Sequence, residues 1–413
     1  MRILFVTNFY PPMFIGGYEL NCRDIAEGLR ASGHDVHVLA SDYLKSEVSQ
    51  PDRNIQRKLR LWKAWEREQT VLTPKAIRER MTIQQHNVRV AHTTLEQFQP
   101  DIVVMWSGMG LGRGLLSALE QHSLVVYYLL DGWLATYIGQ RKSERIVRTA
   151  RRIFDIVSKP FGAPRNVIQG ENLIFNSAAL REQYRRAGVN TGQSIVIHLG
   201  IPTEYFPFQQ QHIINRSAET PMMILYSGQI VPHKGVDTLV RALATLRAFQ
   251  GLEQVRLTLI GAIIQENYGT HLRALIAELN LSEAITIVPR RSREELARIF
   301  GEHDVFAFPS EWEEPFALTL LEAMATGIPV VSSLTGGSIE VVRDGVNAFA
   351  FQAGNVDNLA RRLADALRTP QHAAEIGRRA SEEVYQRYTL EVQTRALEAR
   401  LKRQMYAVSN NSD

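Results

Sequence analysis

Short apolar runs alternate with longer amphipathic stretches along most of this chain. Near the N-terminus, an apolar run at 2–8 is followed by a loop, a helical stretch at about 18–32 and a second apolar run at 36–40. A strand–loop–helix–strand unit of roughly forty residues is the building block of a parallel α/β sheet. The same layout recurs with a strand at 222–228 and a helix at 236–248. The pattern therefore predicts two α/β domains in succession.

The other apolar runs predict further strands in both domains. They lie at 101–106, 124–130, 173–176, 194–198, 255–260, 285–288, 305–308 and 328–332. Helices are predicted at 271–279, 293–300, 316–325, 356–368 and 371–386, and a last one from Leu390 to about Met405. Residues 200–211 are predicted to link the two domains. A Gly-Gly turn, a short helix and a hairpin-like turn are expected within 333–351.

The stretch 304–331 places two carboxylates close to a predicted helix start. Glu314 lies in an acidic, proline-bounded loop, and Glu322 follows eight residues later. On one helix, eight residues would put both side chains on nearly the same face, about 12 Å apart. The first turn, at 316–319, would offer unpaired backbone N–H groups, which suit a phosphate. The expected ligand is phosphorylated and polyhydroxylated; the alternative is a dipole-stabilising Glu and a solvent-facing helical Glu.

Three other features stand at the carboxyl ends of predicted strands, where parallel sheets bind ligands. Gly16 and Gly17 follow the first strand and would allow a ligand to approach the backbone, unless they serve only the turn. Asp131 follows the strand at 124–130, where it could bind a ligand or cap the next turn. Lys234 precedes a helix, where it could meet a phosphate or remain a solvated loop lysine.

Composition places the chain among water-soluble globular proteins. It has 413 residues, 45% of them apolar, which is enough for two or three cores. The single cysteine, Cys22, allows no internal disulfide, and a Cys/His metal cluster is not available. Because no apolar run is long enough for a signal peptide or a membrane span, a cytoplasmic location is expected.

Charge is unevenly distributed along the sequence. Residues 1–205 contain 26 Lys and Arg against 19 Asp and Glu, whereas the remainder contains 21 against 24. Residues 51–98 are predicted to be helical, polar and rich in Arg and Lys. Their part at 53–67, with apolar residues and tryptophans at near-helical spacing among basic ones, could lie peripherally on an anionic membrane or pack its stripe into the core. A second basic run covers 141–165. The positive half suggests an acidic partner, a phosphorylated acceptor or a membrane surface.

Several motifs, taken in order, resemble those of the retaining nucleotide-sugar glycosyltransferases of family 4, which have the GT-B fold. They are FYPPMFIGG, the turn at Gly33-His34, SGQIVPHKGVDTLVRAL and PSEWEEPFALTLLEAMATGIPVV. The resemblance spans nearly the whole chain. It implies two Rossmann-like domains facing each other across a cleft, an acceptor-side domain at 1–203 and a donor-binding domain at 204–388. The final helix, at about 389–413, would return to the first domain.

The resemblance also implies a role for each motif residue. Glu314 would contact the transferred sugar, Glu322 the ribose, and Lys234 the diphosphate. Asp131 would lie beside the acceptor and the sugar, and together with Glu314 and Lys234 it forms the predicted catalytic set. The remaining donor-binding residues implied are Gly16, Gly17, Gly228, Gln229, Arg290, Phe316, Ala317, Leu318 and Thr319, with the amides of Leu318 and Thr319 under the distal phosphate.

The sequence departs from the family pattern at three positions. Gln229 occupies the position of an arginine that usually pairs with the lysine on the diphosphate. One cation is therefore missing at the leaving group, so another basic residue compensates or donor affinity and turnover are lower. Ala317 and Pro289 replace common glycines, the first in the helix start and the second in the loop expected to contact the base.

The implied activity is metal-independent transfer of a sugar, with retention, from a nucleoside-diphosphate sugar to a glycan, lipid-linked or small-molecule acceptor. No cofactor and no nucleic-acid partner are expected. A nucleotide-sugar-binding protein with weak or no transfer is the alternative, prompted by Gln229. A membrane scaffold would rest on the basic helices alone. A nicotinamide oxidoreductase is disfavoured, because Gly108 and Gly110 are followed by Arg113 where a third glycine is needed.

Overall fold

The chain folds into two compact units, each built on its own parallel sheet. In this computed structural model, residues 1–43, 52–62, 73–138, 170–209 and 220–410 are described. One unit comprises Met1–His198 with Gln393–Asp413, and the other comprises Leu199–Val392. Two parallel-sheet domains were predicted from the apolar runs, and the fold class is confirmed.

The first unit contains a seven-stranded sheet. Its strands are β1 (Arg2–Val6), β2 (Asp35–Ser41), β3 (Ile55–Leu59), β4 (Ile102–Met105), β5 (Val125–Leu129), β6 (Leu173–Phe175) and β7 (Ile195–Val196). They are ordered β3-β2-β1-β4-β5-β6-β7, and all neighbours are parallel. Its helices are α1 (Gly17–Ala31), α2 (Pro74–Phe98), α3 (Arg113–His122), α4 (Trp133–Ile138) and α6 (Ala178–Arg186). Because crossover helices cover a parallel sheet, its strands are almost wholly apolar and buried.

The last helix, α13 (Leu390–Asn410), packs on α1 of the first unit. The side-chain amides of Asn21 and Gln393 exchange hydrogen bonds of 2.9 and 3.0 Å in a buried setting. A Cβ at Gly28 would lie only 3.0 Å from the hydroxyl oxygen of Thr394, so the helices approach closely there. The predicted return of the final helix to the first domain is therefore confirmed.

The helical prediction at 51–98 is confirmed by α2 at Pro74–Phe98, but its basic part at 53–67 is wrong where the structure describes it. Residues Ile55–Leu59 form β3, a parallel edge strand beside β2. Arg57 points inward and donates to the carbonyl oxygens of Tyr10 and Pro11, whereas Lys58 is exposed. The two-residue alternation of a half-buried strand thus prevails over the apparent helical spacing. Residues 63–67 and the basic run at 141–165 lie outside the described residues.

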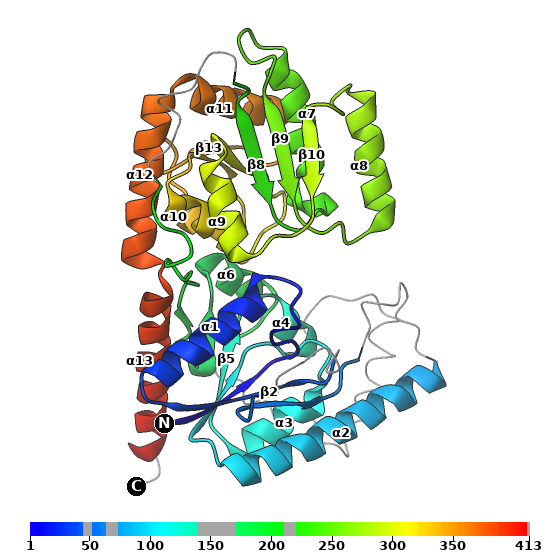
Figure 1. Cartoon of the computed structure of the whole chain (residues 1–413). Helices are drawn as coiled ribbons and strands as arrows, with labels where there is room; N and C mark the ends of the chain where they lie inside the picture. The colour runs from blue at the N-terminus through cyan, green and yellow to red at the C-terminus, as the bar shows by residue number, and fades with distance from the viewer. Residues whose placement is uncertain (44–51, 63–72, 139–169, 210–219, 411–413) are drawn as a thin grey trace. The chain divides into compact units, whose positions relative to one another are not determined.

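The second unit contains a six-stranded sheet. Its strands are β8 (Met223–Ser227), β9 (Arg256–Ile260), β10 (Ile285–Val288), β11 (Val305–Phe308), β12 (Val330–Ser333) and β13 (Phe349–Phe351). They are ordered β10-β9-β8-β11-β12-β13 and are all parallel; Figure 1 shows β8, β9 and β10 side by side. Its helices are α7 (Val236–Arg247), α8 (Glu266–Glu278), α9 (Arg293–Gly301), α10 (Leu318–Thr326), α11 (Val356–Arg368) and α12 (Pro370–Arg387).

Three segments differ from the sequence prediction. Within 333–351, the predicted short helix is a 3-10 helix, η7 (Gly336–Glu340), and the predicted hairpin-like turn is closed by a bridge between Asp344 and Ala348, but β13, which pairs in parallel with β12, was not predicted. Helix α8 begins five residues before the predicted start. The described part of the expected linker, 200–209, packs onto the second unit: Ile201 pairs with Thr389, and the centroid of the buried Phe206 ring lies 6.3 Å from that of Phe300. A buried aromatic side chain anchors this segment more strongly than its glycine and proline suggested.

In each sheet the strand order reverses beside the first strand of the unit. β1 lies between β2 and β4, and β8 lies between β9 and β11. At such a switch point the connections leave on opposite faces of the sheet, which opens a crevice beyond the carboxyl ends of the strands. The loops that follow β1, β4, β8 and β11 are therefore where ligands are expected.

Candidate functional site

An ion pair joins the two switch-point loops of the second unit. Lys234 ends a 3-10 turn, η6 (Pro232–Lys234), after β8, and its Nζ donates to Oε2 of Glu314 in the loop after β11. Only 18% of the Lys234 side chain and 9% of the Glu314 side chain are exposed. The structure thus brings together two residues that lie eighty positions apart in the sequence and were predicted to act on one ligand.

Close backbone contacts hold these two loops in place. Gly235 has a φ of +69°, and a Cβ there would lie 2.0 Å from the carbonyl oxygen of Pro309. The amide of Glu311 donates to the carbonyl of His233 over 3.0 Å, which adds a main-chain link. Glycine is required at 235 because any side chain would collide with backbone as well as adopt an unfavourable conformation. The position of Lys234 is therefore fixed by its neighbour.

The loop that carries Glu314 is also held from the side of η7. The amide of Gly337 donates to the carbonyl oxygen of Glu314 over 2.7 Å. A Cβ at Gly337 would lie 2.1 Å from the carbonyl oxygen of Pro315, and one at Gly336 would lie 2.1 Å from that of Glu314. The Gly-Gly pair was predicted only as a turn, but its further role is to let η7 pack against the Glu314 loop.

Two aromatic residues beside the ion pair were missed in the sequence. The rings of His233 and Trp312 meet edge to face with centroids 5.3 Å apart, and Nζ of Lys234 lies 5.8 Å from the Trp312 ring. Burial, followed by the charge of Lys234, lowers the pKa of His233. Trp312 is exposed, although a large apolar side chain is favoured inside. The only sequence signal was an aromatic residue within the acidic loop SEWEEP.

Glu314 stands in the loop ahead of α10 and Glu322 lies within that helix, as predicted. Helix α10 begins at Leu318, four residues after Glu314. The alternative of a solvent-facing helical Glu is wrong, because only 7% of Glu322 is exposed. A buried carboxylate at this position carries a desolvation cost that a surface residue would not.

The start of α10 has the backbone geometry expected of an anion site. Ala317 is its N-cap and supplies no side-chain hydrogen bond, and Leu318 and Thr319 are the first two helical residues. Their amides belong to the first turn, where helical N–H groups have no intrahelical acceptor. Phe316 is buried, with its ring 6.1 Å from that of Tyr388, the residue that caps the end of α12, and so anchors the helix start.

Gly228 and Gln229 follow β8 directly, beside this pair of loops. The hydroxyl of Tyr226 donates to the carbonyl oxygen of Gln229 over 2.6 Å, which fixes the backbone. A Cβ at Gly261 would lie 1.7 Å from the carbonyl oxygen of Gly228. Arg290 follows β10 and is exposed. Gly228, Gln229 and Arg290 therefore follow the carboxyl ends of their strands, as predicted from the sequence.

The predicted residues of the first unit stand at its own switch-point edge. Gly16 caps α1, and its amide donates to Oε2 of Glu19 over 3.0 Å; Gly17 is the first residue of that helix. Asp131 follows β5, and its Oδ1 accepts from the amide of Trp133 over 2.7 Å. Burial is the main cause that raises the pKa of Asp131, and the nearby charge of Glu19 adds to it. The turn-capping interpretation of Asp131 is thus observed, alongside its position at the strand end.

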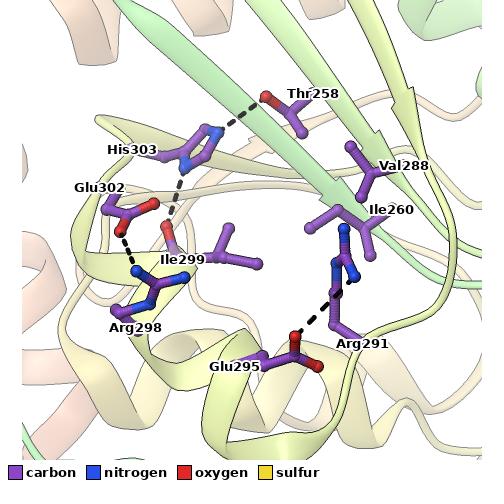
Figure 2. A pocket seen from close by; sticks show the side chains of 9 residues that line it. All are labelled: Thr258, Ile260, Val288, Arg291, Glu295, Arg298, Ile299, Glu302 and His303. Atoms are coloured by element: carbon purple, nitrogen blue, oxygen red, sulfur yellow. Dashed lines mark hydrogen bonds and ion pairs between the residues drawn. The ribbon is translucent and has the colours of Figure 1, made fainter.

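A separate cavity of about 340 Å³ lies between α9 and strands β9 and β10 (Figure 2). Ion pairs on α9 join Arg291 to Glu295 over 3.8 Å and Arg298 to Glu302 over 3.5 Å. The His303 ring is hydrogen-bonded to the Thr258 hydroxyl and to a backbone carbonyl. None of the residues lining this cavity belongs to the predicted site.

The described part of the chain contains neither a side-chain cluster for a metal ion nor a helix suited to span a membrane. No three or more His, Cys, Asp or Glu side chains there are grouped so that they could hold a metal ion. Among the described helices, none combines the length and apolar character needed to span a membrane.

Comparison with known families divides the chain in the same way as its fold. Residues 15–205 match the family described as Glycosyltransferase Family 4, and residues 207–383 match Glycosyl transferases group 1. The two matches cover the two switch-point edges described above.

Individual relatives extend over most of the chain. An uncharacterized glycosyltransferase of Methanocaldococcus jannaschii is 25% identical over 406 residues, which are 94% of this chain and 95% of that protein. A D-inositol 3-phosphate glycosyltransferase of Mycobacterium avium is 31% identical over 293 residues, 65% of this chain and 68% of that protein. The solved structure of Anabaena HepE in complex with UDP-glucose has a TM-score of 0.69 and 21% identity, covering 97% of this chain and 99% of that one. The fold is therefore GT-B, and the chain belongs to the glycosyltransferases of family 4.

Proposed function

We propose that this glycosyltransferase takes its sugar from a nucleoside-diphosphate sugar bound at the switch-point loops of the second unit. The observation that carries the proposal is the pairing of Lys234 with Glu314 at the end of β8 and β11. A cation for the diphosphate and a carboxylate for sugar hydroxyls stand together there, next to the helix start formed by Leu318 and Thr319. Each of these groups matches one part of such a donor.

The leaving group is stabilised by positive charge that is already in place. As the bond to the sugar breaks, negative charge grows on the diphosphate, and Lys234 and the first-turn amides of α10 offset it without a metal ion. Because the backbone around Gly235 is fixed, little reorganisation of Lys234 is needed. Arg290 and Glu322 extend the site toward the base and the ribose.

The transfer is proposed to retain the configuration of the sugar. Glu314 is held by a lysine, so its carboxylate is a poor covalent nucleophile and a better acceptor for sugar hydroxyls. The acceptor then attacks on the same side as the departing phosphate, which takes up its proton. Asp131 is proposed to orient the acceptor and the sugar from the first unit.

The acceptor is proposed to carry an apolar part. In the first unit, Ile15 after β1 and Met109 after β4 are 50% and 42% exposed. β1 and β4 are neighbouring strands, so both loops stand at the switch-point edge, where the acceptor is proposed to bind. An alkyl or prenyl chain on the acceptor would cover these two side chains, whereas a purely polar glycan would leave them in water. Alkyl glycosides should therefore accept sugar better than the matched free sugars.

Thermal unfolding with a panel of nucleoside diphosphates and their sugars tests the donor. A ligand at about one hundred times its dissociation constant adds about 2.7 kcal/mol to the free energy of unfolding. UDP and UDP-glucose are included because a protein of the same fold binds UDP-glucose. We expect the nucleoside diphosphate and nucleotide sugar of one base to raise the unfolding temperature of wild type. The same ligands should not raise that of Lys234→Ala. A folded protein that no nucleotide stabilises would contradict the proposal, and a ligand that binds without yielding product with any acceptor would favour a nucleotide-sugar-binding protein.

A further inference from the structure

Lys234 and Glu314 are hydrogen-bonded to each other in this structure. The Lys234 ammonium donates directly to the Glu314 carboxylate, and both side chains are largely buried. The proposed donor needs both groups for itself, the ammonium for its diphosphate and the carboxylate for its sugar hydroxyls. Binding of a ligand must therefore change this contact, and different ligands change it differently.

A nucleotide sugar and its nucleoside diphosphate product differ in what they offer Glu314. The sugar of the donor supplies hydroxyl donors that replace the lysine as partners of the carboxylate. The product supplies only further negative charge, so Glu314 remains beside an added anion and competes with it for Lys234. Like charges a few ångströms apart in a partly buried site repel each other strongly.

We propose that Glu314 discriminates the donor from the product by exchanging partners with Lys234. When the sugar is present, Glu314 binds its hydroxyls and Lys234 is given over to the diphosphate. When the sugar has left, the Lys234–Glu314 pair forms again and weakens the hold on the nucleoside diphosphate, which promotes its release. This inference rests on the proposed function and adds a role in product release to the positioning of the sugar.

The geometry makes Glu314 suitable for substitution. Its amide donates to the carbonyl of Trp312 over 2.6 Å, and its own carbonyl accepts from the amide of Gly337 over 2.7 Å. Main-chain bonds thus shape the loop, so Glu314→Gln should keep the fold while removing the charge. Glu313→Gln is the matched control, because this neighbouring carboxylate is exposed and the change in net charge is identical.

The experiment is calorimetric titration of UDP and UDP-glucose, or of the matching pair for another base if the panel selects one. In Glu314→Gln we expect UDP to bind about tenfold more tightly, because one repulsive charge is removed and Lys234 is released. UDP-glucose should bind no more tightly than to wild type, so the ratio of the two dissociation constants shifts by at least tenfold. Glu313→Gln should leave both constants within about twofold, since an exposed charge in water is largely screened.

The coupling to Lys234 is tested in a double-mutant cycle. In a Lys234→Ala background, Glu314→Gln should tighten UDP binding by less than it does in wild type, because the cation for which the two anions compete is gone and only the direct repulsion between Glu314 and the diphosphate remains. Glu314→Ala provides a second carboxylate deletion and should also tighten UDP binding, and thermal unfolding verifies that each variant is folded.

Failure of this inference and failure of the proposed function look different. If no nucleotide or nucleotide sugar binds to wild type, the proposed function fails. If both ligands bind to wild type but Glu314→Gln and Glu314→Ala leave UDP affinity unchanged or weaker, the partner exchange is contradicted while the donor site stands. Equal tightening by Glu313→Gln would also contradict it, since the effect would then be one of net charge.

Discussion

The glycines of the two switch-point edges differ in what surrounds them. In the second unit, a Cβ at Gly235 or Gly337 would lie about 2 Å from a backbone carbonyl oxygen. In the first unit, a Cβ at Gly16 would meet only a Glu19 carboxylate oxygen, at 3.9 Å. Gly235 and Gly337 therefore serve the packing of loops, and Gly16 leaves space beside the backbone. Gly108 after β4 is instead crowded by the Trp133 side chain, 2.5 Å from an added Cβ.

The charged residues at the two edges differ in the same way. Lys234 and Glu314 are held by loops that contact each other, and their charges pair where the diphosphate and the sugar are proposed to bind. Asp131 is bound by the turn that follows its own strand. A rigid, charge-paired edge suits a donor whose leaving group is always a diphosphate, whereas a more open edge suits acceptors that vary. Preorganisation is thus concentrated where negative charge develops.

The largest expected effect comes from removing the cation of the second unit. Lys234→Ala should lower turnover by about 10²–10³-fold, because a preorganised charge at the leaving group is lost. Product formation measured by mass spectrometry verifies this. Lys402→Ala, a change on α13 that removes only an ion pair with Glu398, is the control and should transfer normally.

Alanine at Gly235 and at Gly16 compares the two edges directly. Gly235→Ala should lower the free energy of unfolding by about 3 kcal/mol, since its φ of +69° and the Pro309 carbonyl both oppose a side chain. Gly16 has an extended backbone, so Gly16→Ala should change stability by less than about 0.5 kcal/mol while weakening donor use. Urea unfolding gives both values. Equal stability losses would remove the distinction between the two kinds of glycine.

Asp131→Asn should lower transfer by about a hundredfold, as expected for a group that orients the reacting partners. Although Asp131→Asn should lower activity, it should raise the free energy of unfolding near neutral pH. Burial raises the pKa of Asp131 in the folded state, so wild type loses stability as pH rises from about 4, the unfolded value, through the raised pKa. Asparagine still accepts from the Trp133 amide and does not ionise.

Unfolding of wild type and Asp131→Asn measured from pH 3 to pH 8 tests this sign. The variant should be the more stable at neutral pH, and the difference should vanish below about pH 4. A variant that is less stable at pH 7 would show that the charge on Asp131 is favourable at this edge.

The smallest effect is expected from restoring a second cation beside Lys234. Gln229 follows β8, and its backbone is fixed by the Tyr226 hydroxyl. Gln229→Arg should therefore place a guanidinium near the diphosphate and tighten donor binding by about tenfold. Gln229→Lys separates the gain of charge from the fork-shaped geometry of arginine. A loss of affinity in both would mean that the loop has adapted to an uncharged residue.

Much of this fold could be predicted because buried parallel strands are continuous apolar runs. β10, β11 and α11 begin and end at the predicted residues. β3 was missed because an edge strand carrying Arg57 inward resembles an amphipathic helix over five residues. The Phe206 segment was assigned to a linker because its anchor, Phe300, is almost a hundred positions away.

The site was predicted in part, and the limit was again distance along the chain. Local patterns placed Lys234, Glu314 and the start of α10 in their correct loops, but their functional roles remain proposals. Three contacts at the site join residues about eighty positions apart. They are the ion pair itself, the edge-to-face contact of His233 with Trp312, and the close approach of Gly235 to the Pro309 carbonyl oxygen. No local period encodes such contacts, since they depend on the order of the strands.

Turnover of a nucleotide sugar by Glu314→Gln, relative to Glu313→Gln, tests the central claim most directly. The two variants remove one negative charge from adjacent positions, and Glu314 is the buried carboxylate that is paired with Lys234. The account predicts that Glu314→Gln remains folded and loses at least about a hundredfold in sugar transfer, while Glu313→Gln stays close to wild type. Near-normal transfer by folded Glu314→Gln would contradict the assignment of the second unit's switch-point loops as the donor site.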